Sequence, residues 1–369
     1  MLTSNALCIK LSCLSRENPG ISRFSRTGTK VRIRCLVNFQ RGEMELRKDP
    51  ITRSWVAVGH PERAVERPGP CPLCPENRIE THVLVEIPPT GRWRVRAYPH
   101  FRPLYRVEGD PGRMADGIYD RMAPVGAHEV IVETPEHGLP LERMPDDQIE
   151  LVLSAYVARI VDLKRDARFK YVTVFKNVGA QSGEEWTHAN SQVTATTFVP
   201  RRILYELRSA REWYKNHERC VFCDIIRQDI RQKSRIVDNV GDYYAFCPYA
   251  SRVPYEVWLI PRTHNHQFEA PLSGENRRHL ASLLGRTLRR LSQIATSYHM
   301  VVHTSPSTLQ NKGELGQYWK TIAGDYHWHI EILPIVEQRS KSYSIKEVYF
   351  NGTLPEEAAA RLRALNPER

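Results

Sequence analysis

The chain has 369 residues and a formal net charge of +11, from 53 Lys and Arg against 42 Asp and Glu. Hydrophobic residues make up 41% and charged residues 26%. This balance is typical of a globular protein and unlike that of a disordered, collagen-like or coiled-coil chain. No run approaches 18 consecutive apolar residues, so we expect no transmembrane helix and a cytoplasmic protein. The length suggests two or three domains, or one large duplicated domain.

Residues 1–43 differ in composition from the rest of the chain. They hold eight basic residues and two acidic ones, which accounts for +6 of the net charge, and they show no clear hydrophobic periodicity. Two interpretations fit: an organelle transit peptide, which would place the protein in an organelle matrix, or upstream sequence before a start at Met44. The remaining charge of +5 argues against nucleic acid as a partner, although the pI of 9.3 raises it.

The first elements predicted after residues 1–43 are a turn that contains two cysteines, followed by two strands. Cys71 and Cys74 form a CxxC pair, and such thiolates can take two corners of a tetrahedral zinc site. A redox pair and two plain buried cysteines are the alternatives. Residues 94–103 and 129–132 follow as strand-like segments, and a Pro-containing turn then leads to His137.

A helix and two further strands complete this half. Residues 145–163 have apolar side chains at three- and four-residue intervals and acids in the first turn, which predicts a helix. Residues 171–175 form a strand candidate, and a second strand begins at His188 with polar and apolar residues alternating.

The second half repeats this order of elements. It contains Cys220 and Cys223, a segment at 244–254, an apolar run that leads to His264, a helix at 273–291, a strand at 300–303 and a strand that begins at His327. The repeat predicts an α+β fold in which two units, each an antiparallel sheet with one long helix, are fused as an internal pseudo-dimer. The predicted divisions are a leader at 1–43 and halves at 44–205 and 206–369.

The sequence resembles the galactose-1-phosphate uridylyltransferase family, within the histidine-triad superfamily, over about residues 44–365. The segments that carry this resemblance are 47–56, 71–77, 176–179 with Gly183, the two strands that begin with histidine, and 349–359. It implies two histidine-triad-like units, a homodimer, and a nucleotide sugar or sugar phosphate as the ligand.

The resemblance also implies bound zinc. One ion would be held by Cys71, Cys74, His137 and His188. A second site, present in some relatives, maps to Cys220, Cys223, His264 and His327, with His266 as an alternative to His264. Two thiolates and two imidazoles make a closed structural site rather than a catalytic one.

The family's reaction is a double displacement in which a histidine attacks the α-phosphate of a nucleotide sugar and becomes nucleotidylated. The family segment reads His-Pro-His-Ser-Gln, and its second histidine is the nucleophile. Here the segment reads His188-Ala-Asn-Ser-Gln192, so Asn190 occupies the nucleophile position. A carboxamide nitrogen is not nucleophilic, because its lone pair is delocalised into the carbonyl.

We expect other residues to contribute to catalysis. Ser191 and Gln192 could still hydrogen-bond a phosphoryl oxygen. His329 lies at the equivalent position of the second half and is a possible replacement nucleophile. Four single histidines were expected to be surface or otherwise satisfied residues: His100, His128, His279 and His299.

The loop before His188 is a second departure from the family. The resemblance implies substrate binding by Asn177, Gly179, Gly183 and Glu185, but the family has small hydroxylated residues where this chain has Glu184 and Glu185. These carboxylates would repel a diphosphate, recruit a cation, or point to solvent. If Glu185 repels phosphate, restoring activity would need Glu185→Ser in addition to Asn190→His.

The sequence therefore predicts a uridylyltransferase-like nucleotidyltransferase whose catalysis is altered or impaired because Asn190 replaces the histidine. A different class of function is a lapsed enzyme, namely a zinc-stabilised scaffold that binds a nucleotide or a protein without turnover. A third is a zinc-dependent nucleic-acid binder, suggested by the pI and the two CxxC pairs.

Overall fold

A computed structural model describes residues 44–59, 70–77, 82–271, 273–307, 319–336 and 349–368. The predicted leader at 1–43 lies outside these residues. In the part of the chain that is described, no helix combines the length and the apolar character that a membrane span requires.

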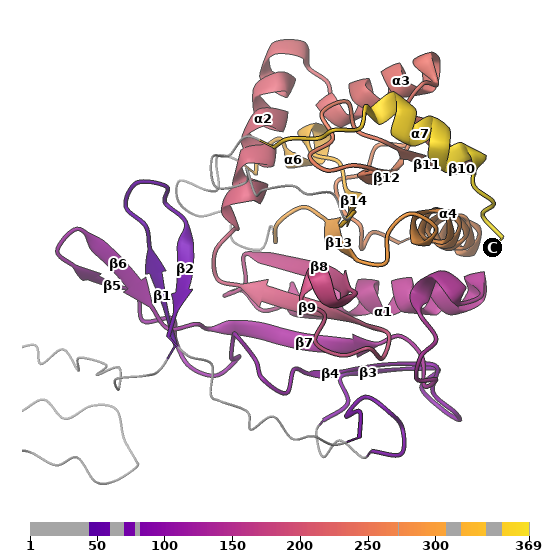
Figure 1. Ribbon diagram of the computed structural model, residues 1–369. Coiled ribbons are helices and arrows are strands. Elements are labelled where there is room, and N and C mark those ends of the chain that lie inside the picture. The colour runs from indigo at the N-terminus through magenta and orange to yellow at the C-terminus, as the bar shows by residue number, and fades with distance from the viewer. Residues whose placement is uncertain are drawn as a thin grey trace, which may run out of the picture. The chain divides into compact units, whose positions relative to one another are not determined.

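The main sheet has ten antiparallel strands in the order β10-β11-β12-β14-β13-β8-β9-β7-β4-β3 (Figure 1). The first half of the chain supplies β3 (Val85–Ile87), β4 (Val95–Pro99), β7 (Gly126–Val132), β8 (Tyr171–Val178) and β9 (Asn190–Thr196). The second half supplies β10 (Ile236–Val240), β11 (Tyr243–Phe246), β12 (Val257–Pro261), β13 (Tyr298–His303) and β14 (His329–Pro334).

The two halves meet where β8 pairs with β13, with Met300 opposite Lys176. From each outer edge toward this junction, the first half has the order β3-β4-β7-β9-β8 and the second half the matching order β10-β11-β12-β14-β13, which confirms the predicted α+β pseudo-dimer. The register refines the repeat by one residue: Gln192 lies opposite Val130, and its equivalent Glu331 lies opposite Trp258. Counting back by equal numbers of residues from His137 and His264 would instead pair Val130 with Val257.

Two long helices cover one face of the sheet and pack against each other. They are α1 (Asp146–Leu163) and α4 (Gly274–Ser292), which agree with the predicted ranges within one residue and lie side by side in Figure 1. Their apolar faces supply much of the main core. A buried ion pair ties α1 to β7, because Arg159 donates to both carboxylate oxygens of Glu129 at 2.6 and 2.7 Å.

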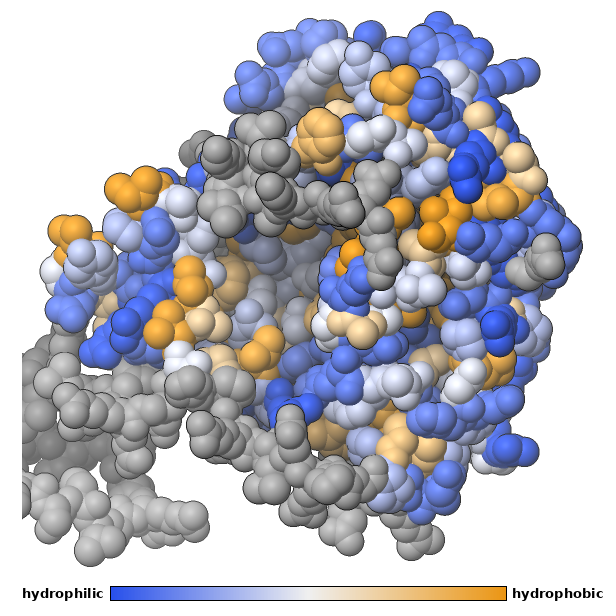
Figure 2. Space-filling model, in the orientation of Figure 1, coloured by the Kyte–Doolittle hydropathy of each residue, from blue (hydrophilic) through white to orange (hydrophobic). Residues whose placement is uncertain are grey.

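The remaining elements surround this layered core. A smaller antiparallel sheet has the order β2-β1-β6-β5 and consists of β1 (Glu45–Lys48), β2 (Trp55–Val58), β5 (Met114–Asp116) and β6 (Tyr119–Met122). Figure 2 shows hydrophobic surface at the outer ends of its hairpins, where Ile51 and Ile118 are 87% and 79% exposed.

The short and connecting helices are η1 (Leu141–Arg143), η2 (Ala180–Ser182), α2 (Arg201–His217), α3 (Val221–Gln232), α6 (Ile322–Asp325) and α7 (Pro355–Ala364). The expected boundary between residues 205 and 206 lies inside α2. We therefore place the link between the two repeats in this helix and not at a loop.

The tight approach of β7 and β9 can be tested at Gly126. A β-carbon there would lie 2.3 Å from the carbonyl oxygen of Ala195 and 2.9 Å from Cβ of Tyr105, so Gly126→Ala forces a backbone to move. We expect the free energy of unfolding, measured by urea titration, to fall by about 1–3 kcal/mol. Gly274→Ala is the matched control, because its β-carbon would meet only the end of Arg278 at 3.6 Å. Equal stability of the two variants would contradict this packing.

Candidate functional site

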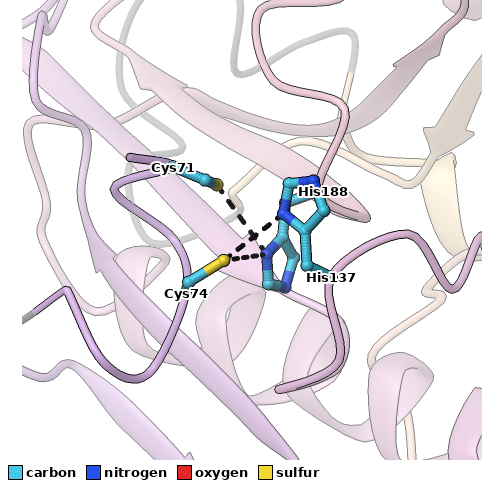
Figure 3. Close-up of side chains that lie close together, drawn as sticks. All are labelled: Cys71, Cys74, His137 and His188. Carbon is cyan, nitrogen blue, oxygen red and sulfur yellow. Dashed lines mark hydrogen bonds between the residues drawn. The ribbon is translucent and has the colours of Figure 1, made fainter. Parts of the chain in front are cut away.

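Four predicted ligand residues of the first half converge at one point (Figure 3). Cys71 and Cys74 come from one turn, His137 follows β7, and His188 precedes β9. The Cys74 sulfur lies 3.3 Å from Nδ1 of His137 and 3.5 Å from Nδ1 of His188. The four candidate ligand atoms all lie within 4.8 Å of one another.

The surroundings of these side chains suit a metal ion. Nε2 of His188 donates to the carbonyl oxygen of Thr134 at 2.8 Å, which leaves the Nδ1 lone pair directed toward the two sulfurs. Burial and the neighbouring Cys71 raise the pKa of the Cys74 thiol to about 11. A cation at the centre would reverse this effect, because it stabilises both thiolates. The group can therefore hold a metal ion.

The second half contains a matching group. Cys220, Cys223, His264 and His327 bring their ligand atoms within 4.8 Å of one another. Nδ1 of His264 and Nδ1 of His327 lie 3.3 and 3.5 Å from the Cys223 sulfur, and Nε2 of His264 donates to the carbonyl oxygen of Ala323. His266, the alternative ligand, is bonded to the Ser305 hydroxyl instead and is not part of this group.

Asn190 opens β9 directly after the first metal-type group. Its side-chain nitrogen donates to the carbonyl oxygens of His188 at 2.7 Å and Trp186 at 3.2 Å. The equivalent His329 makes the corresponding bond, from Nδ1 to the carbonyl oxygen of His327 at 3.1 Å. The amide of Asn190 thus reproduces the Nδ1–H contact of a histidine at this position and supplies no equivalent of Nε2.

Ser191 points away from Asn190 and Gln192, which corrects its expected contact with phosphate. Side chains alternate along a strand, so Ser191 faces α1 while its neighbours face the opposite side of the sheet. Its hydroxyl donates to Glu133 at 2.5 Å and lies 2.5 Å from the hydroxyl of Tyr156, and the residue is fully buried. Lys176 completes this network by donating to Glu133 and to the carbonyl oxygen of Asn190, both at 2.8 Å.

His329 is also placed differently from the sequence expectation of a replacement nucleophile. It is fully buried and sandwiched between Trp258 and His303, with both pairs of ring centroids 4.6 Å apart. Its Nε2, the nitrogen that would attack, is itself buried, so a phosphate does not reach it in this structure.

A third group of side chains surrounds His329 and includes His303, Glu331 and Glu206 from α2. Although burial opposes the charged form, the Glu206 and Glu331 carboxylates raise the pKa of His303 to about 10. Arg252 and Arg202 also bond Glu331, so both carboxylates of this group have cationic partners. Sequence reasoning missed Glu206, because α2 shows no motif and reaches the group only through the fold.

Two histidines that were expected to be unremarkable lie beside Gln192. His128 is bonded to Gln192 through Nε2 at 3.0 Å, and its ring stacks on that of His100 with centroids 3.9 Å apart. Nε2 of His100 is bonded in turn to Glu185 at 3.0 Å, and Glu185 also accepts from Arg102. The structure therefore connects Glu185 to Gln192. Nothing in the local sequence indicates this, because β4 and β7 become neighbours only in the sheet.

Asn177, Gly179 and Gly183 are the other residues expected to bind substrate. They lie at or just after the C-terminal end of β8. Asn177 is bonded to His299 of β13 across the junction of the halves, at 2.9 Å. Gly179 and Gly183 have φ angles of 82° and 74°, which favour glycine. A β-carbon on Gly179 would lie 2.2 Å from the Ser297 hydroxyl oxygen, so this loop rests directly on the second half.

Comparisons with known proteins agree with this arrangement. The family model described as galactose-1-phosphate uridyl transferase, N-terminal domain, matches residues 51–200. The chain is 25% identical over 341 residues to ADP-glucose phosphorylase of Arabidopsis thaliana, covering 87% of this chain and 93% of that protein. It is 26% identical over 338 residues to galactose-1-phosphate uridylyltransferase of Thermotoga maritima, covering 88% and 99%.

A solved structure of uridylyltransferase superimposes on this chain with a TM-score of 0.72 and 29% identity. The match covers 87% of this chain and 98% of that one. The similarity therefore extends through both halves of the repeat, beyond the residues that the family model matches.

The buried network behind β9 yields a stability prediction. Lys176→Met leaves the Glu133 carboxylate without its cationic partner in the core, and we expect the free energy of unfolding to fall by about 3–5 kcal/mol. The exposed Lys215→Met should change it by no more than about 0.5 kcal/mol. Adding Glu133→Gln to Lys176→Met should recover part of the loss in urea unfolding. A Lys176→Met protein as stable as the control would show that the pair is unimportant.

Proposed function

We propose that this chain is a nucleotidyltransferase of the galactose-1-phosphate uridylyltransferase family, within the histidine-triad superfamily, and that its catalysis is altered. It binds a nucleoside diphosphate sugar on the face of β9 that carries Asn190 and Gln192. The nucleotidyl group passes directly to an acceptor phosphate, with no covalent intermediate on the protein.

The observation that carries this proposal is the environment of position 190. Asn190 keeps the hydrogen bonds of a histidine Nδ1–H and lacks a nucleophilic nitrogen. The described histidines near it are engaged in other contacts, and His137 directs Nδ1 at Cys74. His188 is directed at the cysteines, and His100 and His128 use both ring nitrogens in hydrogen bonds.

Direct transfer needs no residue at position 190 to react. An oxygen of the acceptor, inorganic phosphate or a sugar phosphate, forms a bond to the α-phosphorus. The bond to the departing sugar phosphate breaks, and the leaving oxygen keeps the electron pair. The names of two relatives, ADP-glucose phosphorylase and galactose-1-phosphate uridylyltransferase, point to acceptors of this class, which supports the choice. The protein's part is to hold the two phosphates in line and to stabilise the charge that develops.

The two Cys/His groups fit structural zinc ions, and we assign zinc to both. Each offers two thiolates and two imidazoles, and zinc bound in this way contributes to folding rather than to the reaction. The apparent binding energy of such a site is about 10–16 kcal/mol. Family membership also leads us to expect a homodimer.

The absence of a covalent intermediate is tested by intact-mass spectrometry after incubation with UDP-glucose or ADP-glucose. The quench must be neutral or alkaline, because a phosphohistidine bond is acid-labile. We expect no adduct on the natural protein and a nucleotidyl adduct on Asn190→His. The position of His329 indicates that a histidine at 190 would bond the backbone through Nδ1 and present Nε2. Asn190→Gln, which adds no nucleophile, is the matched control.

Adduct formation, together with assays of donor binding and of transfer to an acceptor, separates the candidate functions. An adduct on the natural protein would overturn direct transfer, and peptide mapping would identify the nucleophile. Donor binding with neither adduct nor transfer to phosphate or sugar phosphates would favour a scaffold that binds without turnover. No donor binding at all would reject the proposed site.

Zinc assignment is tested by metal analysis of the full chain. We expect two zinc ions per chain, and one in each of Cys74→Ser and Cys223→Ser, because each substitution removes a thiolate from one group only. Each loss should lower the thermal unfolding midpoint. Cys247→Ser is the control, since this buried cysteine belongs to neither group and should leave the zinc content at two. Retention of two ions in either ligand variant would contradict the assignment.

A further inference from the structure

The Glu185 carboxylate occupies a loop position for which the sequence leaves three expectations: repulsion of phosphate, recruitment of a cation, or exposure to solvent. Both of its oxygens are engaged: Oε2 is bonded to Nε2 of His100 at 3.0 Å, and Oε1 accepts from the guanidinium of Arg102. We propose that Glu185, His100 and His128 are positioning residues that aim the amide N–H of Gln192 at a phosphoryl oxygen of the bound nucleotide sugar. This inference rests on the proposed function and deepens it.

The hydrogen bonds around His128 determine which way the Gln192 amide faces. The backbone N–H of Leu104 donates to Nδ1 of His128 at 3.1 Å, so the ring carries its proton on Nε2. That nitrogen must then donate, and it donates to Oε1 of Gln192 at 3.0 Å. Within the described part of the chain, no hydrogen bond occupies the Gln192 nitrogen. Both of its N–H groups are therefore available to an acceptor such as a phosphoryl oxygen.

The hydrogen bonds of His100 determine its tautomer in the same way. The backbone N–H of Arg102 donates to Nδ1 of His100 at 3.1 Å, so Nε2 carries the proton and donates to Glu185. Glu185 in this way fixes the orientation of the His100 ring. The guanidinium of Arg102 balances the carboxylate charge locally, so little of that charge remains to repel a phosphate.

Ring stacking transmits this constraint from His100 to His128. The two rings are 6° from parallel and 3.9 Å apart, and the residues are only 5% and 6% exposed. Trp186 also packs against the His100 ring, with centroids 5.2 Å apart. Burial, with His100 as a further cause, lowers the pKa of His128 to about 4, so its ring stays neutral and keeps the same donor at ordinary pH.

Two substitutions at Glu185 distinguish positioning from repulsion. Glu185→Gln removes the charge but keeps a carbonyl oxygen that can accept from His100, whereas Glu185→Ser removes the contact. Positioning predicts a Kd for UDP-glucose or ADP-glucose within about threefold of the natural protein for Glu185→Gln, and a roughly tenfold weaker Kd for Glu185→Ser, measured calorimetrically. Repulsion predicts tighter binding by both variants. Glu184→Ser is the matched control and should change the Kd by less than about twofold.

A spectroscopic readout separates failure of this inference from failure of the proposed function. In protein labelled with ¹⁵N-histidine, we expect His128 and His100 to show the Nε2–H tautomer. Because the Arg102 N–H still donates to Nδ1, the tautomer itself should persist in both variants. The His100 Nε2–H proton should keep its hydrogen-bonded chemical shift in Glu185→Gln and lose it in Glu185→Ser. A natural protein with these tautomers but no nucleotide-sugar binding would reject the proposed function alone. The opposite tautomer at His128, or tighter binding by Glu185→Ser, would overturn the positioning role.

Discussion

Side chains alternate between the two faces of β9, and the rest of the site depends on this alternation. Asn190 and Gln192 share one face, and Ser191 lies on the other, where Glu133, Tyr156 and Lys176 hold it. The buried network behind the strand therefore supports the side chains in front of it without taking part in their chemistry. Lys176 links the two directly, since it bonds both Glu133 and the backbone carbonyl of Asn190.

The internal duplication allows equivalent positions of the two halves to be compared within one structure. His329 and Asn190 occupy equivalent strand positions and make equivalent bonds to the backbone two residues earlier. The surroundings have diverged, however. In the second half, Trp258 and His303 enclose the His329 ring. In the first half, Asn190 lies on the same strand face as Gln192, which is connected to Glu185 through His128 and His100.

Prediction from sequence was most successful where spacing along the chain decides the structure. The two long helices were located within one residue, because apolar periodicity and caps are local properties. The CxxC pairs and their histidines repeat in order, so the structure's two groups of four could be anticipated. The one-residue offset at Val130 and Trp258 could not, because strand register depends on partners distant in the sequence.

The sequence by itself determined the α+β class, the duplication and the two candidate metal groups, since each follows from residue type and spacing. The expectation that Asn190 stands where relatives have a histidine came from the family resemblance. Only the tertiary structure decided which side chains face a ligand. Glu185 pairs with His100 and Arg102, Ser191 turns inward and His329 is enclosed. These outcomes depend on strands that are far apart in the chain and adjacent in the sheet, so hydrogen bonds and burial appear only once the register is set.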